Sequence, residues 1–342
     1  MTASRNYSIA TIPGDGIGTE VIPVGQRATE AVAARFGFSV SWTEFDWSCE
    51  RYAETGSMMP EDGIERVRAH DAIYLGAVGW PGVPDHVSLW GLLIPLRREL
   101  DQFANVRPVR LLRGVTSPLA GRGPEDIDFI VVRENVEGEY SEIGGRLYRG
   151  TDNETAVQEA VFTRRGVDRI LDYAFELAAK RKRRHVTSVT KSNGIVHTMP
   201  FWDERFAEAA KRHPDIGTAQ FHIDILTAHF VQHPDWFDVV VGSNLFGDIL
   251  SDLGPAVAGS IGIAPAANID PTGRNPSMFE PVHGSAPDIA GKGIANPVAA
   301  VWTAAMMMDN LGEADAARAI ESAIEVSLEN DATRTGDLGG TA

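Results

Sequence analysis

The chain has 342 residues, which is long enough for two lobes or for one large α/β domain. Its formal net charge of −16 argues against nucleic acid and anionic membrane surfaces as partners. Cys49 is the single cysteine, so no intrachain disulfide can form, and a reducing cytoplasm is the expected location. Residues 1–6 lack a signal-peptide pattern, and no run of about 18 apolar residues predicts a membrane span.

The first part of the chain alternates predicted strands with predicted helices. Residues 7–13 read as a strand, residues 14–18 as a glycine-rich turn and residues 19–36 as a helix. Such a turn is typical of dinucleotide-binding folds, but Thr19 stands where that fingerprint needs its third glycine. The alternative is a turn whose backbone approaches another segment closely. The alternation continues with strands at residues 38–45 and 71–78 and a helix at residues 60–70, as in parallel βαβ units.

Three arginines lie at or near the ends of the next predicted elements. Arg97 lies in a helix at residues 89–100, Arg107 in an extended stretch that includes Pro108, and Arg133 at the end of an apolar strand. Ligands of α/β sheets bind near strand ends, and the guanidinium fork donates two parallel hydrogen bonds to a carboxylate. For each arginine taken alone, a solvated surface position is the favoured alternative. Residues 137–151 follow as a turn-rich arm that could form a hairpin.

The central region supplies three aspartates of interest. Asp224 lies in an apolar run at residues 221–226, read as a strand, where a carboxylate needs a partner. A buried strand at residues 239–241 leads into a helix expected to begin near Asp248, and Asp252 follows four residues later on the same face. Two such carboxylates suit Mg²⁺ or Mn²⁺, and they equally suit a charged helix start with a solvated acid. The flanking elements are helices at residues 163–184 and 200–212 and a strand at 185–189.

The C-terminal region contains one irregular loop that carries ligand-binding residue types. Residues 279–288 combine glycine, proline, serine and histidine, and loops on a rigid frame commonly carry function. Helices are predicted at residues 296–311 and 314–328, and the glycine-rich tail, residues 333–342, is expected to be mobile.

Six stretches together resemble the β-decarboxylating dehydrogenases, the family of isopropylmalate, isocitrate, tartrate and D-malate dehydrogenases. They occur in family order over nearly the whole chain, at residues 12–18, 105–108, 132–135, 191–193, 244–253 and 280–288. Within the family the chain looks most like the D-malate and tartrate branch, on residues 79–81, 83–86, 88–91, 96–99 and 222–226.

The resemblance implies an α/β, isopropylmalate/isocitrate dehydrogenase-like, two-lobed fold that is not a standard Rossmann fold. The large NAD-binding lobe would comprise residues 1–102 and 258–342, and the small lobe residues 103–257 with a dimer arm. Related chains usually continue into a terminal helix, whereas this sequence stops at Ala342. Either the sequence is trimmed or that helix is missing.

The resemblance also implies the site, with each role carried over to the matching residue. Lys191 and Asp224 would act across subunits, so an obligate homodimer is expected. An acid at Asp288 implies NAD over NADP, and a K⁺ ion is a further candidate. The implied roles are: catalysis by Tyr140 as general acid and Lys191 in the proton relay; substrate binding by Arg97, Arg107, Arg133, Ser88 and Leu92; Mg²⁺ or Mn²⁺ binding by Asp224, Asp248 and Asp252; and NAD binding by His283, Gly284, Ser285, Ala286, Pro287, Asp288 and Asn296.

The implied reaction is the NAD- and metal-dependent oxidative decarboxylation of D-malate, a small dicarboxylate 2-hydroxy acid, to pyruvate and CO₂. Tartrate oxidation, or a broader activity that includes 3-isopropylmalate, is the near alternative. An NAD-binding regulatory protein without catalysis is the alternative from another class. Against it, every expected substrate, metal and catalytic residue is present.

Overall fold

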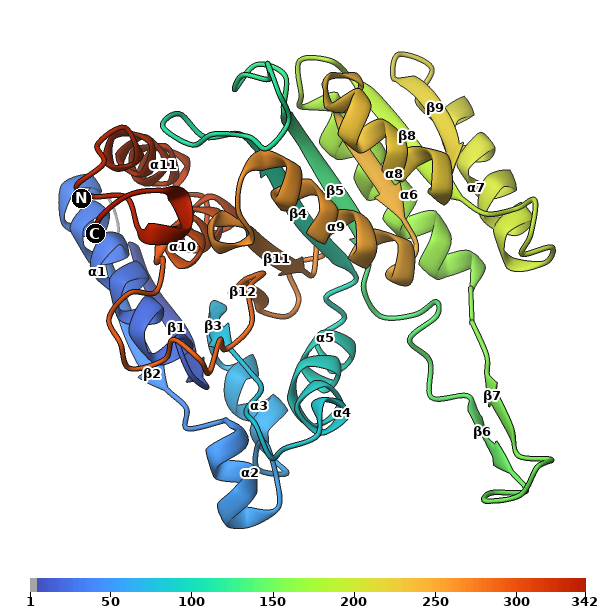
Figure 1. The fold of residues 1–342 in the computed structure, drawn as a ribbon, viewed down its shortest axis with the longest axis horizontal. Coiled ribbons are helices and arrows are strands. Elements are labelled where there is room, and N and C mark those ends of the chain that lie inside the picture. Colours follow the sequence, from blue (N-terminus) through green and yellow to red (C-terminus); the bar gives the residue numbers. More distant parts are fainter. Residues whose placement is uncertain (1–4) are drawn as a thin grey trace.

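The computed structural model describes residues 5–342, so most of the N-terminal segment expected to lack a signal peptide lies outside the described residues. One sheet of ten strands forms the centre, in the order β2-β1-β3-β12-β11-β4-β5-β10-β8-β9 (Figure 1). Within residues 5–342, no helix is long and apolar enough to cross a membrane. The strands of the main sheet are β1 (Arg5–Gly14), β2 (Phe38–Glu44), β3 (Ala72–Ala77), β4 (Ala104–Arg110), β5 (Asp128–Glu134), β8 (His185–Thr190), β9 (Gly217–His222), β10 (Val239–Gly242), β11 (Pro265–Ile269) and β12 (Ser277–Pro281).

Helices cover both faces of this sheet. On one half, α1, α10 and α11 pack over one face and the helices between residues 49 and 99 over the other; on the other half, α6 and α7 oppose α8 and α9 (Figure 1). The helices are α1 (Gly18–Phe36), α2 (Cys49–Thr55), α3 (Gly63–Arg68), α4 (Asp85–Ser88), α5 (Ile94–Glu99), α6 (Arg164–Ala179), α7 (Thr198–Arg212), α8 (Ile223–Gln232), α9 (Asn244–Ala258), α10 (Val298–Asn310) and α11 (Ala314–Leu328).

Strand direction changes in the middle of the sheet. β11 runs antiparallel to both β12 and β4, and β4 runs antiparallel to β5, whereas the other neighbours are parallel. In this register Asn105 lies between Asn268 on one side and Arg133 on the other. Since successive side chains alternate between faces, Arg107 points to the same face as these three, beneath α9. The register therefore gathers polar side chains on one face of an otherwise apolar sheet.

Four local predictions differ from the structure. The helix α2 was not predicted, and the predicted helix at residues 89–100 contains a π-helical turn (Leu89–Leu93). Asp224 lies in the first turn of α8 and not in a strand, because β9 ends at His222. α9 begins at Asn244, so Asp248 lies in its second turn and does not cap it.

The predicted arm is present as a hairpin, and the predicted mobile tail is held by hydrogen bonds. The expected arm is a hairpin of β6 (Gly144–Leu147) and β7 (Thr155–Gln158), which extends away from the body (Figure 1). The tail is hydrogen-bonded and not free, since the Thr341 amide donates to Asp331 and the Ala342 amide to Arg334. Strands from both predicted lobes, which were divided at residues 102 and 258, belong to one continuous sheet. The division into two lobes stays a prediction.

Candidate active site

Three buried arginines converge on one face of the sheet. Arg107 of β4 and Arg133 of β5 are 7% and 2% exposed, and Arg97 reaches the same region from α5 at 5% exposure. Burial lowers the pKa of Arg107, and it lowers the pKa of Arg133 to about 10. Positive charge held in a poorly solvated place is a strong anion site, because few waters compete for the guanidinium donors. The predicted solvated alternative is thus wrong for all three.

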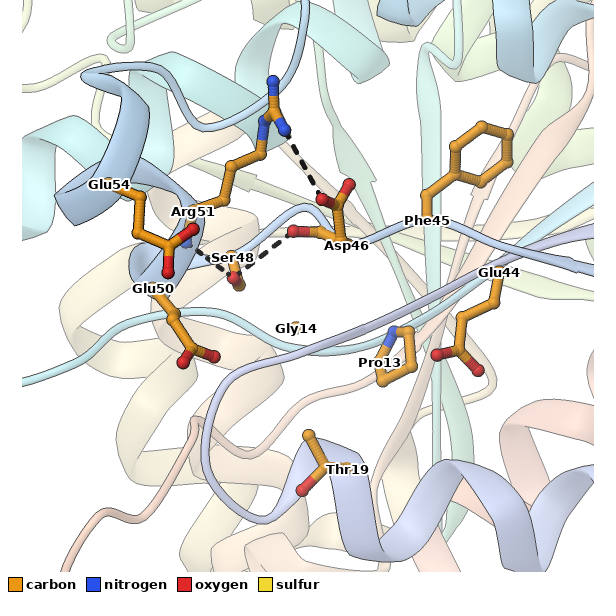
Figure 2. A pocket seen from close by; sticks show the side chains of 10 residues that line it. All are labelled: Pro13, Gly14, Thr19, Glu44, Phe45, Asp46, Ser48, Glu50, Arg51 and Glu54. Atoms are coloured by element: carbon orange, nitrogen blue, oxygen red, sulfur yellow. Dashed lines mark hydrogen bonds and ion pairs between the residues drawn. The ribbon is translucent and has the colours of Figure 1, made fainter.

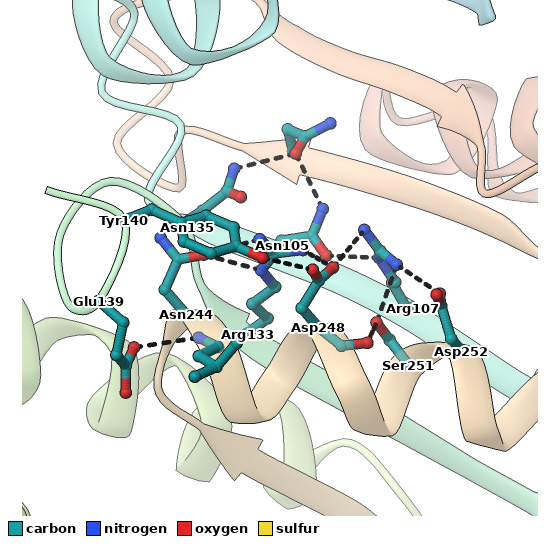
Figure 3. A network of polar contacts seen from close by, with 12 residues as sticks. Asn105, Arg107, Arg133, Asn135, Glu139, Tyr140, Asn244, Asp248, Ser251 and Asp252 are labelled. Carbon is teal, nitrogen blue, oxygen red and sulfur yellow. Dashed lines mark hydrogen bonds and ion pairs between the residues drawn. The ribbon is translucent and has the colours of Figure 1, made fainter. Parts of the chain in front are cut away.

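Asp248 and Asp252 of α9 lie against these arginines (Figure 3). Asp248 is hydrogen-bonded to Arg133, and one of its oxygens lies 3.7 Å from Arg107. Asp252 lies 3.4 Å from Arg107, while 59% of its side chain stays exposed. α9 comes this close because Gly247 has no side chain: a Cβ there would lie 2.6 Å from the Cβ of Arg133. Two carboxylates at one end of a basic cluster keep oxygen atoms available for a divalent cation.

The two aspartates differ in their electrostatic surroundings. Burial alone would raise the pKa of Asp248, but the guanidinium groups of Arg133 and Arg107 outweigh it and hold that pKa below its ordinary value. Burial raises the pKa of Asp252, and the Asp248 charge adds to the rise. Asp248 is therefore the carboxylate that stays ionised in acid, as a hard-cation ligand must.

The Tyr140 phenol completes the cluster from the segment before the arm. Its hydroxyl donates a hydrogen bond of 2.8 Å to Asp248, and the Arg133 guanidinium lies 5.4 Å from its ring centroid (Figure 3). Burial and then the Asp248 charge raise the pKa of Tyr140, so the phenol keeps its proton. A protonated phenol at an anion site can act as a proton donor.

A buried amide network supports the arginines, and sequence reasoning gave its members no role. Asn105 accepts from the Nε of Arg107 at 2.8 Å and donates to Asn268 at 2.8 Å. Asn268 donates to Glu280 at 2.7 Å, and Glu280 accepts from Arg97 at 2.8 Å. The chain of contacts crosses β4, β11 and β12 and fixes two of the arginines. The available signal was an asparagine inside each of two apolar strands, since buried amides need partners.

Lys191 and Asp224 form a separate pair. The Lys191 ammonium donates to Asp224 at 2.9 Å, and 66% of the Asp224 side chain is exposed. That hydrogen bond lowers the pKa of Asp224. No contact joins this pair to Asp248 or Asp252 within residues 5–342, and no group of three metal-binding side chains occurs in that range. One subunit therefore brings two of the three predicted metal ligands together and leaves the third apart.

The predicted cofactor loop lies against the glycine-rich turn after β1. The Ile17 amide donates to the Ser285 carbonyl at 2.9 Å, and a Cβ on Gly16 would lie 2.1 Å from that oxygen. The turn is thus the close backbone approach that its glycines predicted. Ala286 adopts a positive φ of 41°, and Asp288 and Pro287 are exposed. The loop presents its tip, including Gly284, to solvent.

Two further residues of the predicted cofactor set have constrained side chains. His283 is hydrogen-bonded through Nδ1 to the Gly284 carbonyl, and its buried Nε2 has no partner within residues 5–342. Asn296 is buried, accepts from the Val298 amide and donates to Asp337 at 2.9 Å. The unpaired His283 nitrogen is a buried polar atom whose hydrogen bond is unmade, and a ligand could contact it only after the surrounding loop moves.

A pocket of about 190 Å³ lies beside the same turn and is lined in part by Pro13, Gly14 and Thr19 (Figure 2). Its walls carry Glu44, Asp46, Glu50 and Glu54, with one arginine, Arg51. Four carboxylates make this pocket a poor site for the phosphates of a dinucleotide.

The two predicted specificity residues are not equally placed. Ser88 is 7% exposed, and its hydroxyl donates to the Asp85 carbonyl at 3.0 Å. Leu92 is fully buried in an apolar cluster with Trp47 and Leu96, so its side chain does not face solvent. A substrate contact by Leu92 would need a rearrangement of that cluster, because the side chain is enclosed on all sides.

The chain is similar in sequence and in structure to known dehydrogenases. A model of the isocitrate/isopropylmalate dehydrogenase family matches residues 8–342. The chain is 58% identical to the D-malate dehydrogenase (decarboxylating) of Escherichia coli (strain K12), over 99% of this chain and 95% of that protein. It is 56% identical to the tartrate dehydrogenase/decarboxylase of Pseudomonas putida, over 99% and 94% of the two chains. The crystal structure of isocitrate dehydrogenase from Methylococcus capsulatus matches with a TM-score of 0.87 at 36% identity, over 97% and 94%. These likenesses confirm the predicted fold class.

Proposed function

The chain belongs to the isocitrate/isopropylmalate dehydrogenase family, and from this premise we propose that it oxidises and decarboxylates D-malate to pyruvate and CO₂, with NAD and Mg²⁺ or Mn²⁺. The observation that carries the proposal is the convergence of three buried arginines, two carboxylates and a protonated phenol on one face of the sheet. D-Malate has two carboxylates, and guanidinium groups bind carboxylates through paired, charge-assisted hydrogen bonds.

The residues present fit both a metal ion and NAD. Asp248 and Asp252 offer hard oxygen ligands, and Asp224 of a second subunit would supply the third. The exposed Asp288 carboxylate suits the two ribose hydroxyls of NAD and repels the 2′-phosphate of NADP. When bound, the metal ion supplies positive charge beside the C2 oxygen, and NAD accepts the hydride.

The chain's own residues would then divide the work. Arg97, Arg107 and Arg133 hold the substrate carboxylates and fix its orientation. Lys191, in its neutral amine form, would take the proton of the C2 hydroxyl and become an ammonium as the hydride leaves C2. The resulting β-keto acid loses CO₂, and Tyr140 donates its phenolic proton to C3 to give pyruvate.

A homodimer with shared sites is part of the proposal. Supporting it, Lys191 and Asp224 form a pair away from the arginine cluster of their own chain. The arm also carries large apolar side chains in solvent, with Leu147 58% and Tyr148 69% exposed. Exposed apolar side chains on a projecting hairpin need a partner surface. The division into a large lobe (1–102 and 258–342) and a small lobe (103–257) remains part of this proposal.

The alternatives differ in support. The likeness to a tartrate dehydrogenase/decarboxylase favours tartrate as a second substrate. An apolar 3-isopropylmalate side chain would have to meet the half-buried Leu89 and Leu93, because Leu92 is enclosed. A regulatory NAD-binding protein would not need the arginine, aspartate and tyrosine cluster. The single cysteine, buried and unpaired, supports a reducing compartment such as the cytoplasm.

The proposal is tested by following NADH formation with D-malate, L-malate, the tartrates and 3-isopropylmalate, with pyruvate assayed in the same samples. We expect D-malate to give equal NADH and pyruvate, loss of both on chelation, and recovery with Mn²⁺. Repeating the assay with added K⁺ measures any need for that ion. NAD binding with no turnover on any of these acids would favour the regulatory alternative.

Mixing two inactive variants tests whether the sites are shared between subunits. Tyr140→Phe and Lys191→Ala remove groups that the proposal places on different subunits of one site. After unfolding and refolding the two together, mixed dimers contain one intact site, and random pairing restores roughly a quarter of the wild-type activity. Each variant refolded alone is the control, and no gain on mixing would show that Lys191 acts within its own chain.

A further inference from the structure

α5 carries two neighbouring arginines that make unrelated contacts. Arg97 turns inward to Glu280, as described above. Arg98 turns toward the segment that carries Tyr140: its Nη2 donates to the Tyr140 carbonyl at 2.6 Å, and its Nη1 to the Glu142 carboxylate at 2.9 Å. The Arg98 guanidinium also lies 5.0 Å from the ring centroid of Trp90. Arg98 thus links α5 to the backbone of Tyr140, the proposed proton donor.

The contact between Arg98 and Trp90 depends on the local backbone. Trp90 lies in the π-helical turn (Leu89–Leu93), and Arg98 lies in the α-helix that follows it. π-Helical turns are rare and are frequently found at functional sites. The Trp90 ring gives the guanidinium a flat surface and limits the directions in which it can donate.

Tyr140 is held at both of its ends. Its phenol is fixed by Asp248, and its carbonyl is fixed by Arg98. Its neighbour Glu139 is tied to α9: the Glu139 carboxylate accepts from the Ser243 hydroxyl at 2.7 Å and from the Leu245 backbone amide at 3.0 Å. Within residues 5–342, Arg98 is the one residue before position 134 whose side chain makes a hydrogen bond to residues 137–143, while Arg133 contacts the Tyr140 ring.

We propose that Arg98, with Trp90 as its platform, is a positioning residue that sets Tyr140 for proton transfer to C3. The inference rests on the proposed function, because it takes Tyr140 as the proton donor. Within residues 5–342, the Arg98 side chain makes no hydrogen bond to the arginine cluster or to the predicted cofactor loop, so its contact with the site runs through the Tyr140 backbone. Proton transfer depends steeply on the placement of the donor, and a displacement of about 1 Å can lower a rate about a hundredfold.

The chain offers a matched control for this contact. Arg122 is exposed to the same extent as Arg98, at 26% of the side chain. It likewise donates to a carbonyl at 2.6 Å, that of Gln232, and to a carboxylate at 3.1 Å, that of Asp235. Arg122→Met therefore removes an equivalent set of contacts, but to Gln232 and Asp235 and not to the segment that carries Tyr140.

The experiment separates the proton step from the hydride step. Pyruvate formation from oxaloacetate, the β-keto acid of D-malate, needs decarboxylation and the Tyr140 proton but no hydride transfer. We expect Arg98→Met to lower this rate about tenfold to a hundredfold, with KM for NAD and the melting temperature unchanged. Arg98→Lys keeps the charge and one donor and restores part of the rate, while Arg122→Met has the wild-type rate.

A double variant tests whether Arg98 acts through Tyr140. In a Tyr140→Phe background, Arg98→Met should cause little further loss of pyruvate formation, because the group that it positions is gone. Equal fold-losses in both backgrounds, an unchanged rate in Arg98→Met, or a loss accompanied by lower melting temperature would each overturn the inference. If Tyr140→Phe alone leaves pyruvate formation unchanged, the proposed role of Tyr140 fails first, and the two failures are thereby distinguished.

Discussion

Gly247→Ala should destabilise the protein, although alanine is the better helix former. Gly247 lies inside α9, where glycine to alanine ordinarily adds about 1 kcal/mol of stability. Here the added Cβ would lie 2.6 Å from the Cβ, 2.7 Å from the Cγ and 3.0 Å from the Cα of Arg133. These atoms belong to a buried residue in the middle of the sheet, so they cannot move aside cheaply. Overpacking costs about 1 to 3 kcal/mol, and after subtraction of the helix-propensity gain we expect a net loss of up to about 2 kcal/mol.

Urea unfolding at one fixed protein concentration measures this loss, since dimer stability depends on concentration. The displaced Arg133 should also raise KM for the dicarboxylate substrate while KM for NAD stays unchanged. Gly336→Ala is the matched control, because a Cβ there meets nothing within 4 Å and the backbone is unstrained. If Gly247→Ala equals or exceeds the wild type in stability with unchanged KM, the close approach of α9 to β5 is not a constraint.

Three further outcomes follow from the site. Burial raises the pKa of Glu134 to about 8, so between about pH 4.5 and pH 8 the folded state keeps a proton that the unfolded chain loses. The free energy of unfolding therefore falls as the pH rises through this range, by up to about 1.4 kcal/mol per pH unit. Glu134→Gln should flatten that slope in urea unfolding across this range; an equally steep slope would show that other groups carry it. Tyr140→Phe should lower pyruvate formation about a hundredfold or more while NAD still binds, as followed by NADH and pyruvate assays. Asp252→Asn should raise the Mn²⁺ concentration needed to increase the melting temperature, and an unchanged Mn²⁺ response would remove Asp252 from the metal site.

Most of the strands and helices could be predicted because their signal is local. The β-branched run of β10 and the helical period of α11 need no information from elsewhere in the chain. The short apolar run around Asp224 was misassigned for the same reason, since six such residues fit the start of a helix as well as a strand. The buried amide network was missed because its members are far apart in the sequence. Asn268 and Asn105 are separated by 163 positions, and no local pattern predicts that they are hydrogen-bonded.

The candidate site was predicted from residue types at motif positions, and its geometry was not. The sequence indicated that Arg107, Asp248 and Tyr140 belong to one constellation, yet the hydrogen bond from Tyr140 to Asp248 and the ion pair of Asp248 with Arg107 depend on how closely α9 approaches the sheet. The enclosure of Leu92 could not be foreseen, because the π-helical turn shifts which side chains of that helix point inward. The partner of Arg98 was likewise invisible, since adjacent arginines in a helix look equivalent in the sequence.

The position of β11 and β12 in the sheet constrains how the chain is made in the cell. These strands fill the space between β3 and β4, but they leave the ribosome about 170 residues after β4, which takes roughly 10 to 30 s at ordinary rates of synthesis. Throughout that interval β3 and β4 present unpaired backbone edges with apolar faces, the kind of edge that pairs with other chains. Nascent chains that stall before Pro281 are therefore expected to depend on chaperones, and the full sheet closes only near the end of translation.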